Sequence, residues 1–257
     1  MARKKGQRSA VWNGRLYKGK IYFTKKPENS KINTSSTAEI EPFSIWKLTD
    51  SELTIGEGAC LGPFQQITLE NAQLRIGNGV KIGAYVTILV KGSKDKKTIV
   101  TIGDDEKIDE YCHLHCQPGG NLDIGKRGHL FSGVYIGPFE QPFCIGERVT
   151  FAQKAVAAGR GPLRIGRYSL IGSLAVIITE AHNYKSLGTP VRDQGFNNRG
   201  VVIGEDVWVG ASATILDGSV INDKTVIGAG GLVKGETVEG AVYYGVPIRK
   251  SISLKRG

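Results

Sequence analysis

A six-residue spacing of large apolar residues runs through most of the chain and limits the folds that it can adopt. A strand places every second side chain on one side, so an anchor at every sixth position suits short strands separated by corners. Of the 24 anchors, only Ala157 is not Ile, Leu, Val or Phe. The anchors form eight triplets: Ile55/Leu61/Ile67, Ile76/Ile82/Ile88, Ile102/Ile108/Leu114, Ile124/Leu130/Ile136, Ile145/Phe151/Ala157, Ile165/Ile171/Ile177, Ile203/Val209/Ile215 and Ile221/Ile227/Val233.

The residue four places after an anchor is small or β-branched in nearly every repeat, with Gln65 and Glu106 as exceptions. Both positions of a repeat point into one narrow interior, so one is bulky and the other small. Three strands and three corners bring the chain back to its starting edge as a triangular coil. Stacked coils pair as parallel strands about 4.8 Å apart. Because one coil cannot bury its own apolar face, the stack itself is the core.

The residues inserted between triplets all fall at the same corner of the predicted prism. Most insertions are short, but the one between the sixth and seventh triplets forms a long loop, residues 178–202, and carries His182. Its surroundings read "IITEAHNYKSLGTPVRDQGFNNRGVVIG" over residues 177–204. Insertions on one side of a repeat protein commonly build the binding site, which makes this loop the first functional candidate.

The charge of the chain is concentrated near its start. The formal net charge is +10, and residues 1–31 hold ten Lys or Arg and one acid, Glu28. We expect a solvated arm there, with attachment to an anionic membrane surface as the sharper alternative. No basic stripe continues into the body, so nucleic-acid binding is not expected.

Composition sets the expected compartment and chemistry. The chain has 35 glycines and one methionine, which suits strands and turns. It contains no apolar run of transmembrane length and no signal-peptide core, so we expect a cytoplasmic protein, with the inner membrane surface as a peripheral location. Its four cysteines do not make a disulfide framework.

The last hundred residues carry a family resemblance. The stretch "VVIGEDVWVGASATILDGSVINDKTVIGAGGLVKGETVEGAVYYGVPIRK", residues 201–250, resembles the coenzyme A half of hexapeptide-repeat acyltransferases, in their sugar O-acetyltransferase branch. The resemblance implies an all-β fold, a left-handed parallel β-helix of about eight triangular coils over residues 51–236. Residues 1–50 remain an unassigned basic segment, and residues 237–257 form a tail at the coenzyme site. It also implies a homotrimer with coenzyme A in the clefts between subunits.

The same resemblance assigns the chemistry to the long loop. His182 would be the general base that takes a proton from an acceptor hydroxyl as it attacks the thioester of acetyl-coenzyme A. Glu180, Asp193 or a backbone carbonyl would orient its ring. Trp208, in the motif "EDVWVG", would lie near the cleft and help to wall the site.

Further residues receive binding roles from the family motifs. In the galactoside and maltose enzymes an asparagine and an aspartate hold a neutral sugar, whereas this chain has Ala152 and Arg160 at the matching places. We therefore expect Arg160 to suit a negatively charged acceptor, and Asn183 to contact substrate as well. The positions expected to bind the coenzyme are Gly210, Ala211, Ala229, Gly230, Lys234, Arg249 and Lys250.

The remaining histidines are not expected to act. His113 and His115 flank the anchor Leu114 and point outward, while Cys112 falls at a small interior position. His129 precedes an anchor and reads as a surface residue. No distant ligand pair completes a metal site with "CHLHC", so no metal is expected.

These features favour an acetyl-coenzyme A-dependent O-acetyltransferase of a sugar, most simply of a cell-surface polysaccharide or its precursor. The alternative is N-acetylation of an amino sugar or xenobiotic with the same base and coenzyme. A β-helix carbonic anhydrase would need a second histidine five residues after His182, which is missing. A non-catalytic β-helix scaffold is a more distant alternative, because the coenzyme half is well kept.

Overall fold

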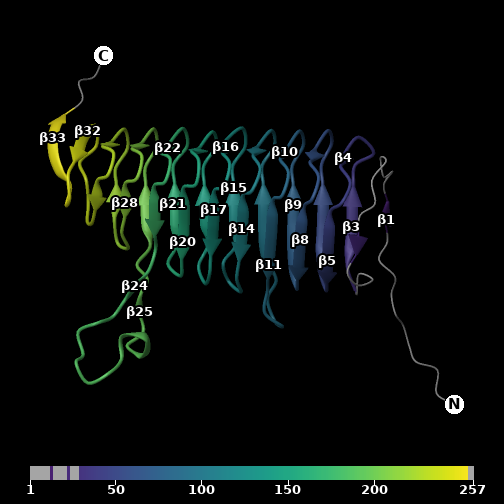
Figure 1. The fold of residues 1–257 in the computed structure, drawn as a ribbon, viewed down its shortest axis with the longest axis horizontal. Helices are drawn as coiled ribbons and strands as arrows, with labels where there is room; N and C mark the ends of the chain where they lie inside the picture. Colours follow the sequence, from purple (N-terminus) through teal and green to yellow (C-terminus); the bar gives the residue numbers. More distant parts are fainter. Residues whose placement is uncertain (1–11, 14–21, 24–28, 254–257) are drawn as a thin grey trace.

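The computed structural model describes residues 12–13, 22–23 and 29–253. Their strands form three long sheets around one interior, stacked from one end of the molecule to the other (Figure 1). The chain visits the sheets in a fixed order, and we call them the first, second and third face in that order. The predicted all-β parallel β-helix is confirmed, with about ten coils rather than eight.

The three faces are built from the short strands that the six-residue spacing predicts. The first face contains β1 (Trp12–Asn13), β3 (Lys31–Thr34), β6 (Glu52–Ile55), β9 (Ala72–Ile76), β12 (Thr98–Ile102), β15 (Leu122–Ile124), β18 (Phe143–Ile145), β21 (Leu163–Ile165), β26 (Val201–Ile203) and β29 (Val220–Ile221). The second face contains β4 (Glu39–Ile40), β7 (Cys60–Leu61), β10 (Lys81–Ile82), β13 (Lys107–Ile108), β16 (His129–Leu130), β19 (Thr150–Phe151), β22 (Leu170–Ile171), β27 (Trp208–Val209), β30 (Val226–Ile227), β32 (Ala241–Tyr244) and β33 (Arg249–Ser253). The third face contains β2 (Tyr22–Phe23), β5 (Ile45–Thr49), β8 (Gln66–Glu70), β11 (Thr87–Lys91), β14 (His113–Cys116), β17 (Tyr135–Pro138), β20 (Val156–Gly159), β23 (Val176–Ile178), β28 (Thr214–Ile215) and β31 (Leu232–Val233).

The anchors line the interior. Ile82, Leu130 and Ile171, whose burial tests the register, are 3%, 1% and 1% exposed. Apart from β33, the strands of the three faces pair in parallel with their counterparts one coil away, for example Ile82 with Ile108 and Leu130 with Phe151. The register that the sequence predicts is therefore confirmed.

The β-helix begins earlier than the predicted boundary at residue 51. Thr34, Ile40 and Trp46 pair with Ile55, Leu61 and Ile67, so they continue the six-residue spacing into the preceding coil. Trp46 is fully buried, and Ala38 and Ser44 occupy the small positions. A search for aliphatic anchors misses this coil because two of its anchors are threonine and tryptophan. Most of the basic stretch 1–31 lies outside the described residues.

Glycines next to the anchors let neighbouring coils approach closely at one corner. A Cβ atom on Gly125 would lie 2.5 Å from the carbonyl carbon of Gly146, the equivalent residue one coil later. Real Cβ atoms do not come that close to a backbone, so a larger residue would push the two coils apart.

The long loop leaves the prism between the third and first faces. It contains a short hairpin, β24 (Ala181–His182) paired antiparallel with β25 (Phe196–Asn197), and one 3-10 turn, η1 (Val191–Asp193). Figure 1 shows this loop projecting from the edge of the solenoid. At the C-terminal end, β33 runs antiparallel to β32 and extends the second face.

Glu106 is a carboxylic acid inside the prism, at a position where nearly every other coil has a small residue. It is 1% exposed, and it accepts a hydrogen bond of 2.6 Å from the N–H of Gly128 in the next coil. Burial raises the pKa of Glu106 to about 8, against the opposing effect of that hydrogen bond. The carboxyl is therefore held in its neutral form at neutral pH.

This burial makes stability depend on pH in a defined direction. The unfolded chain releases the Glu106 proton near pH 4.5, whereas the folded chain keeps it until about pH 8. The free energy of unfolding therefore falls as pH rises through this window, by about 1.4 kcal/mol per pH unit from this group. Glu106→Gln keeps an acceptor for Gly128 and should remove that contribution.

As pH rises from 5 to 8, we expect the urea midpoint of Glu106→Gln to increase relative to that of the natural protein, because only the natural protein loses this contribution. Parallel midpoints across this range would show that Glu106 does not titrate in this way.

Candidate active site

The long loop is organised by polar side chains near its hairpin. The Asn183 side chain donates to the carbonyl of Gln194 at 3.0 Å, and its backbone N–H donates to Gly195. The Gln194 amide in turn donates to the carbonyls of Ser186 and Thr189, both at 2.8 Å. Asn183, predicted to contact substrate, thus connects the two sides of the loop in this structure.

His182 lies on β24 and is exposed. Its ring packs against Phe196 on β25, with centroids 4.3 Å apart and planes tilted by 44°. Within the described residues its ring nitrogens make no hydrogen bond. The imidazole is thus held by an aromatic neighbour and keeps both nitrogens available to a reacting group.

The partners predicted to orient His182 are engaged elsewhere. Glu180 accepts a hydrogen bond from Arg160 at 2.9 Å, and the Asp193 carboxylate is 3.8 Å from the adjacent Arg192. Phe196, which was not predicted as a site residue, makes the ring contact with His182 instead. The sequence feature that could have identified it is that Phe196 is the sole phenylalanine in a mostly polar loop.

Arg160 lies at the base of the loop, in the preceding coil. Its guanidinium donates to Glu140 and Glu180, each at 2.9 Å, and its carbon centre is 3.9 Å from the centroid of the Phe196 ring. The cation that the sequence suggested for an acidic acceptor is thus paired with two carboxylates of the same chain.

Trp208 stands on the second face, with 55% of its surface exposed. It lies between Leu170 on β22 and Val226 on β30, so it belongs to an outward row of apolar side chains near the C-terminal end. The second face is opposite the corner from which the loop leaves. A single chain therefore does not bring Trp208 and His182 together.

The predicted coenzyme positions form a column at the corner between the second and third faces. The N–H of Gly210 donates to Ile227 and that of Gly230 to Ala211, so both donors are used by the β-helix itself. The N–H groups of Ala211 and Ala229 have no acceptor in the described part of the chain. A Cβ on Gly210 would be 2.6 Å from the nitrogen of Ala229, which explains the glycine by coil packing.

The cations among the predicted coenzyme-binding residues lie in two places. Arg249 and Lys250 are exposed on β33, opposite Tyr244 and Tyr243 of β32 at the end of the second face. Lys234 is exposed and follows β31, on the third face. Arg249 and Lys250 are thus placed together beyond the column of small residues, and Lys234 is apart from them.

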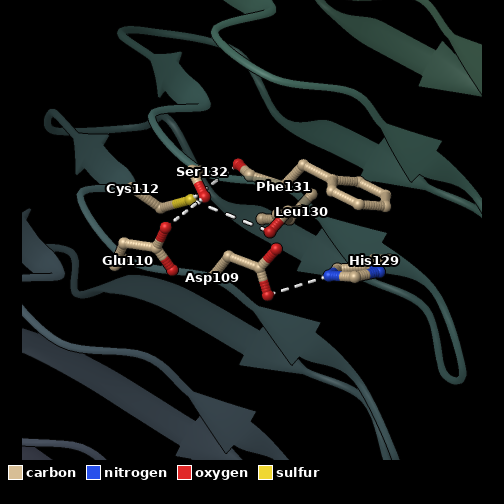
Figure 2. A network of polar contacts seen from close by, with 7 residues as sticks. All are labelled: Asp109, Glu110, Cys112, His129, Leu130, Phe131 and Ser132. Atoms are coloured by element: carbon tan, nitrogen blue, oxygen red, sulfur yellow. Dashed lines mark hydrogen bonds and ion pairs between the residues drawn. The ribbon is translucent and has the colours of Figure 1, made fainter.

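The other histidines take structural roles. The His129 ring is hydrogen-bonded to the Asp109 carboxylate at 2.9 Å, and the Ser132 hydroxyl donates to the Glu110 carboxylate. Figure 2 shows both contacts. His129 also stacks on Phe131 at 3.8 Å between centroids. It is therefore anchored to the second face rather than free on the surface.

His113 and His115 point outward from β14, as predicted, and Cys112 is fully buried. Burial, together with the charges of Lys91 and His113, lowers the pKa of His115. No group of three or more His, Cys, Asp or Glu side chains in the described residues is arranged to hold a metal ion. The described residues also contain no helix that is long and apolar enough to cross a bilayer.

Comparison with known proteins gives partial sequence matches and a match in the fold. A Mycobacterium tuberculosis protein named as an acetyltransferase is 26% identical over 137 residues, which are 53% of this chain and 46% of that protein. An Escherichia coli K12 protein, named for O-acetyl transfer in lipopolysaccharide biosynthesis, is 36% identical over 94 residues, 33% of this chain and 47% of its own length. The chain thus spans about half the length of these curated relatives.

A solved structure supports the fold. The UDP-N-acetylglucosamine O-acyltransferase of Moraxella catarrhalis superposes with a TM-score of 0.51 at 18% identity, covering 91% of this chain and 73% of that one. The family model described as bacterial transferase hexapeptide (six repeats) matches residues 200–235, which hold Trp208, Gly210, Ala211, Ala229, Gly230 and Lys234. Residues 200–235 therefore match the hexapeptide repeat of bacterial transferases, and they lie within a parallel β-helix.

Proposed function

We propose that the protein transfers an acetyl group from acetyl-coenzyme A to a hydroxyl of a sugar, in a cell-surface polysaccharide or its precursor. The observation that carries the proposal is an exposed histidine held on a hairpin, in the longest loop that leaves the described part of a β-helix with hexapeptide repeats. The relative named for lipopolysaccharide O-acetyl transfer supports a carbohydrate acceptor.

The residues fit a direct transfer. His182 accepts the proton of the acceptor hydroxyl while that oxygen attacks the thioester carbonyl carbon. The carbon–sulfur bond then breaks, and the coenzyme leaves as a thiol once its sulfur receives the proton from the imidazolium. The products are an acetyl ester and free coenzyme A.

A cysteine nucleophile is not required and is poorly supported. Burial raises the pKa of the Cys112 thiol to about 11 and raises that of Cys116 further. Burial also raises the pKa of Cys144, the exposed cysteine of the first face. A thiol with a raised pKa is a weak nucleophile at neutral pH.

The column of small residues and the cations of β33 suit the coenzyme. The free N–H groups of Ala211 and Ala229 can donate to the amides of a pantetheine arm, and Arg249 and Lys250 can pair with phosphates. These features line the second face and its corner, where Trp208 also stands.

Because one chain holds His182 and Trp208 on opposite sides of the prism, a site that contains both requires more than one subunit. A complete site would combine the loop of one subunit with the second face of another, which a homotrimer of prisms provides. The loop tip carries exposed apolar side chains for such a contact, Tyr184, Leu187 and Val191.

The base is tested by His182→Ala. We expect kcat to fall by about 10²–10⁴-fold while acetyl-coenzyme A still binds, because general-base catalysis is lost and coenzyme contacts are kept. Release of free thiol with a panel of oligosaccharides and amino sugars measures the rate and separates O- from N-acetylation. Near-normal turnover in a correctly assembled variant would remove His182 from the mechanism.

The coenzyme contacts are tested by Arg249→Ala. Its KM for acetyl-coenzyme A should rise roughly tenfold with kcat retained at saturation, since a phosphate contact far from the thioester contributes uniform binding. Arg75→Ala, which removes an exposed arginine of the first face, is the matched control and should leave both constants unchanged. Equal effects of the two substitutions would argue against a coenzyme site at β33.

The shared site is tested by mixing two variants after subunit exchange: His182→Ala, and Trp208→Ala, which should also lower the rate if Trp208 walls the site. If each site takes its loop and its second face from different subunits, every mixed trimer contains one intact site and activity returns. If both residues act within one chain, every site carries a defect and the mixture stays inactive.

A further inference from the structure

Arg160 connects three successive coils at the corner from which the long loop leaves. It follows β20, and its two carboxylate partners occupy the same corner one coil to either side: Glu140 follows β17, and Glu180 follows β23. We propose that Arg160 is a positioning residue that fixes the hairpin of His182, rather than a site for the acceptor. This inference rests on the proposed role of His182 and deepens it.

The contacts of Arg160 use both the edge and the face of its guanidinium. Nε donates to Glu140 and one terminal nitrogen donates to Glu180, both at 2.9 Å. The face covers the Phe196 ring at 3.9 Å. One side chain therefore holds the strand that enters the hairpin, through Glu180, and the strand that leaves it, through Phe196.

The effect reaches His182 through two short paths. Glu180 is two residues before His182, and Phe196 packs directly on its ring. The hairpin has two residues in each strand, and a two-stranded ribbon of that size is barely stable alone. Its position must therefore come from contacts with the prism, and Arg160 supplies them at both strands.

The burial of the cluster suits this role. The Arg160 side chain is 31% exposed and Glu180 is 21% exposed, so their pair is partly screened from solvent. Two carboxylates already neutralise the guanidinium, which leaves little positive charge for an acidic acceptor. A lysine cannot replace this arrangement, because an ammonium lacks the planar face and the forked donors.

The comparison of Arg160→Lys with Arg167→Lys tests the proposal. Arg167 makes a similar ion pair, with Glu205 at 2.8 Å, and lies near a tyrosine ring, but it is outside the loop. For Arg160→Lys we expect kcat to fall about tenfold to a hundredfold, since small displacements of a catalytic group are costly. KM for both substrates should stay within about twofold, because the proposal leaves substrate binding untouched. The control should match the natural protein.

Limited trypsin digestion gives a readout that does not depend on activity. Lys185 and Arg192 are exposed in the loop, so cleavage after them, followed by mass spectrometry, reports the freedom of the hairpin. Cleavage should accelerate in Arg160→Lys and in Phe196→Leu, and not in Arg167→Lys. The double variant Arg160→Lys/Phe196→Leu should be little worse than either single variant, since both remove the same restraint.

Each outcome decides the question. A raised KM for an acidic acceptor with unchanged kcat and unchanged cleavage would restore Arg160 to acceptor binding and overturn the proposal. Unchanged kinetics and cleavage would also overturn it. If the loop is cleaved faster in the variants but the natural protein transfers no acetyl group, the restraint by Arg160 is supported and the proposed function is wrong.

Discussion

Every coil of this protein depends on the parallel pairing of its strands with the coil before and after it. A single turn has short strands and a narrow interior, so alone it satisfies neither its backbone hydrogen bonds nor its apolar side chains. Pairing such as Ile82 with Ile108 supplies both at once. The antiparallel strand β33 then covers the exposed edge of β32 at the C-terminal end of the second face.

The same requirement places the candidate chemistry outside the repeat. Interior positions take apolar side chains, either bulky or small. A carboxyl group there, that of Glu106, is kept neutral by burial. Residues with freedom to react can be carried by an excursion. The loop with His182 is such an excursion, and its hairpin is tied back to the prism by Arg160 and Phe196. The rigid stack and the reactive loop are thus separate parts joined at one corner.

The sequence predicted most of the fold, because the anchors and their small partners follow directly from strand geometry. It missed the coil of Thr34, Ile40 and Trp46, where a buried tryptophan and a threonine replace aliphatic anchors. It located the loop and His182 but not the contact with Phe196, since loop conformation is not periodic. It also misjudged the surroundings of Arg160, because the two glutamates that bind it lie twenty residues away on either side.

The long loop leaves the prism at one corner, and this has a consequence for how the chain can vary in length. Moving six residues along the repeat advances the chain by one face, so a net gain or loss within the repeat preserves the phase of later strands only if it equals a whole coil. A change of one face would rotate Trp208 away from the second face and carry the cations of β33 with it. At the loop, in contrast, β23 and β26 fix both ends, and the number of residues between them leaves the phase untouched. Length can therefore change there, and in the shorter insertions at the same corner of other coils, while the strands and the other two corners accept change only in complete turns.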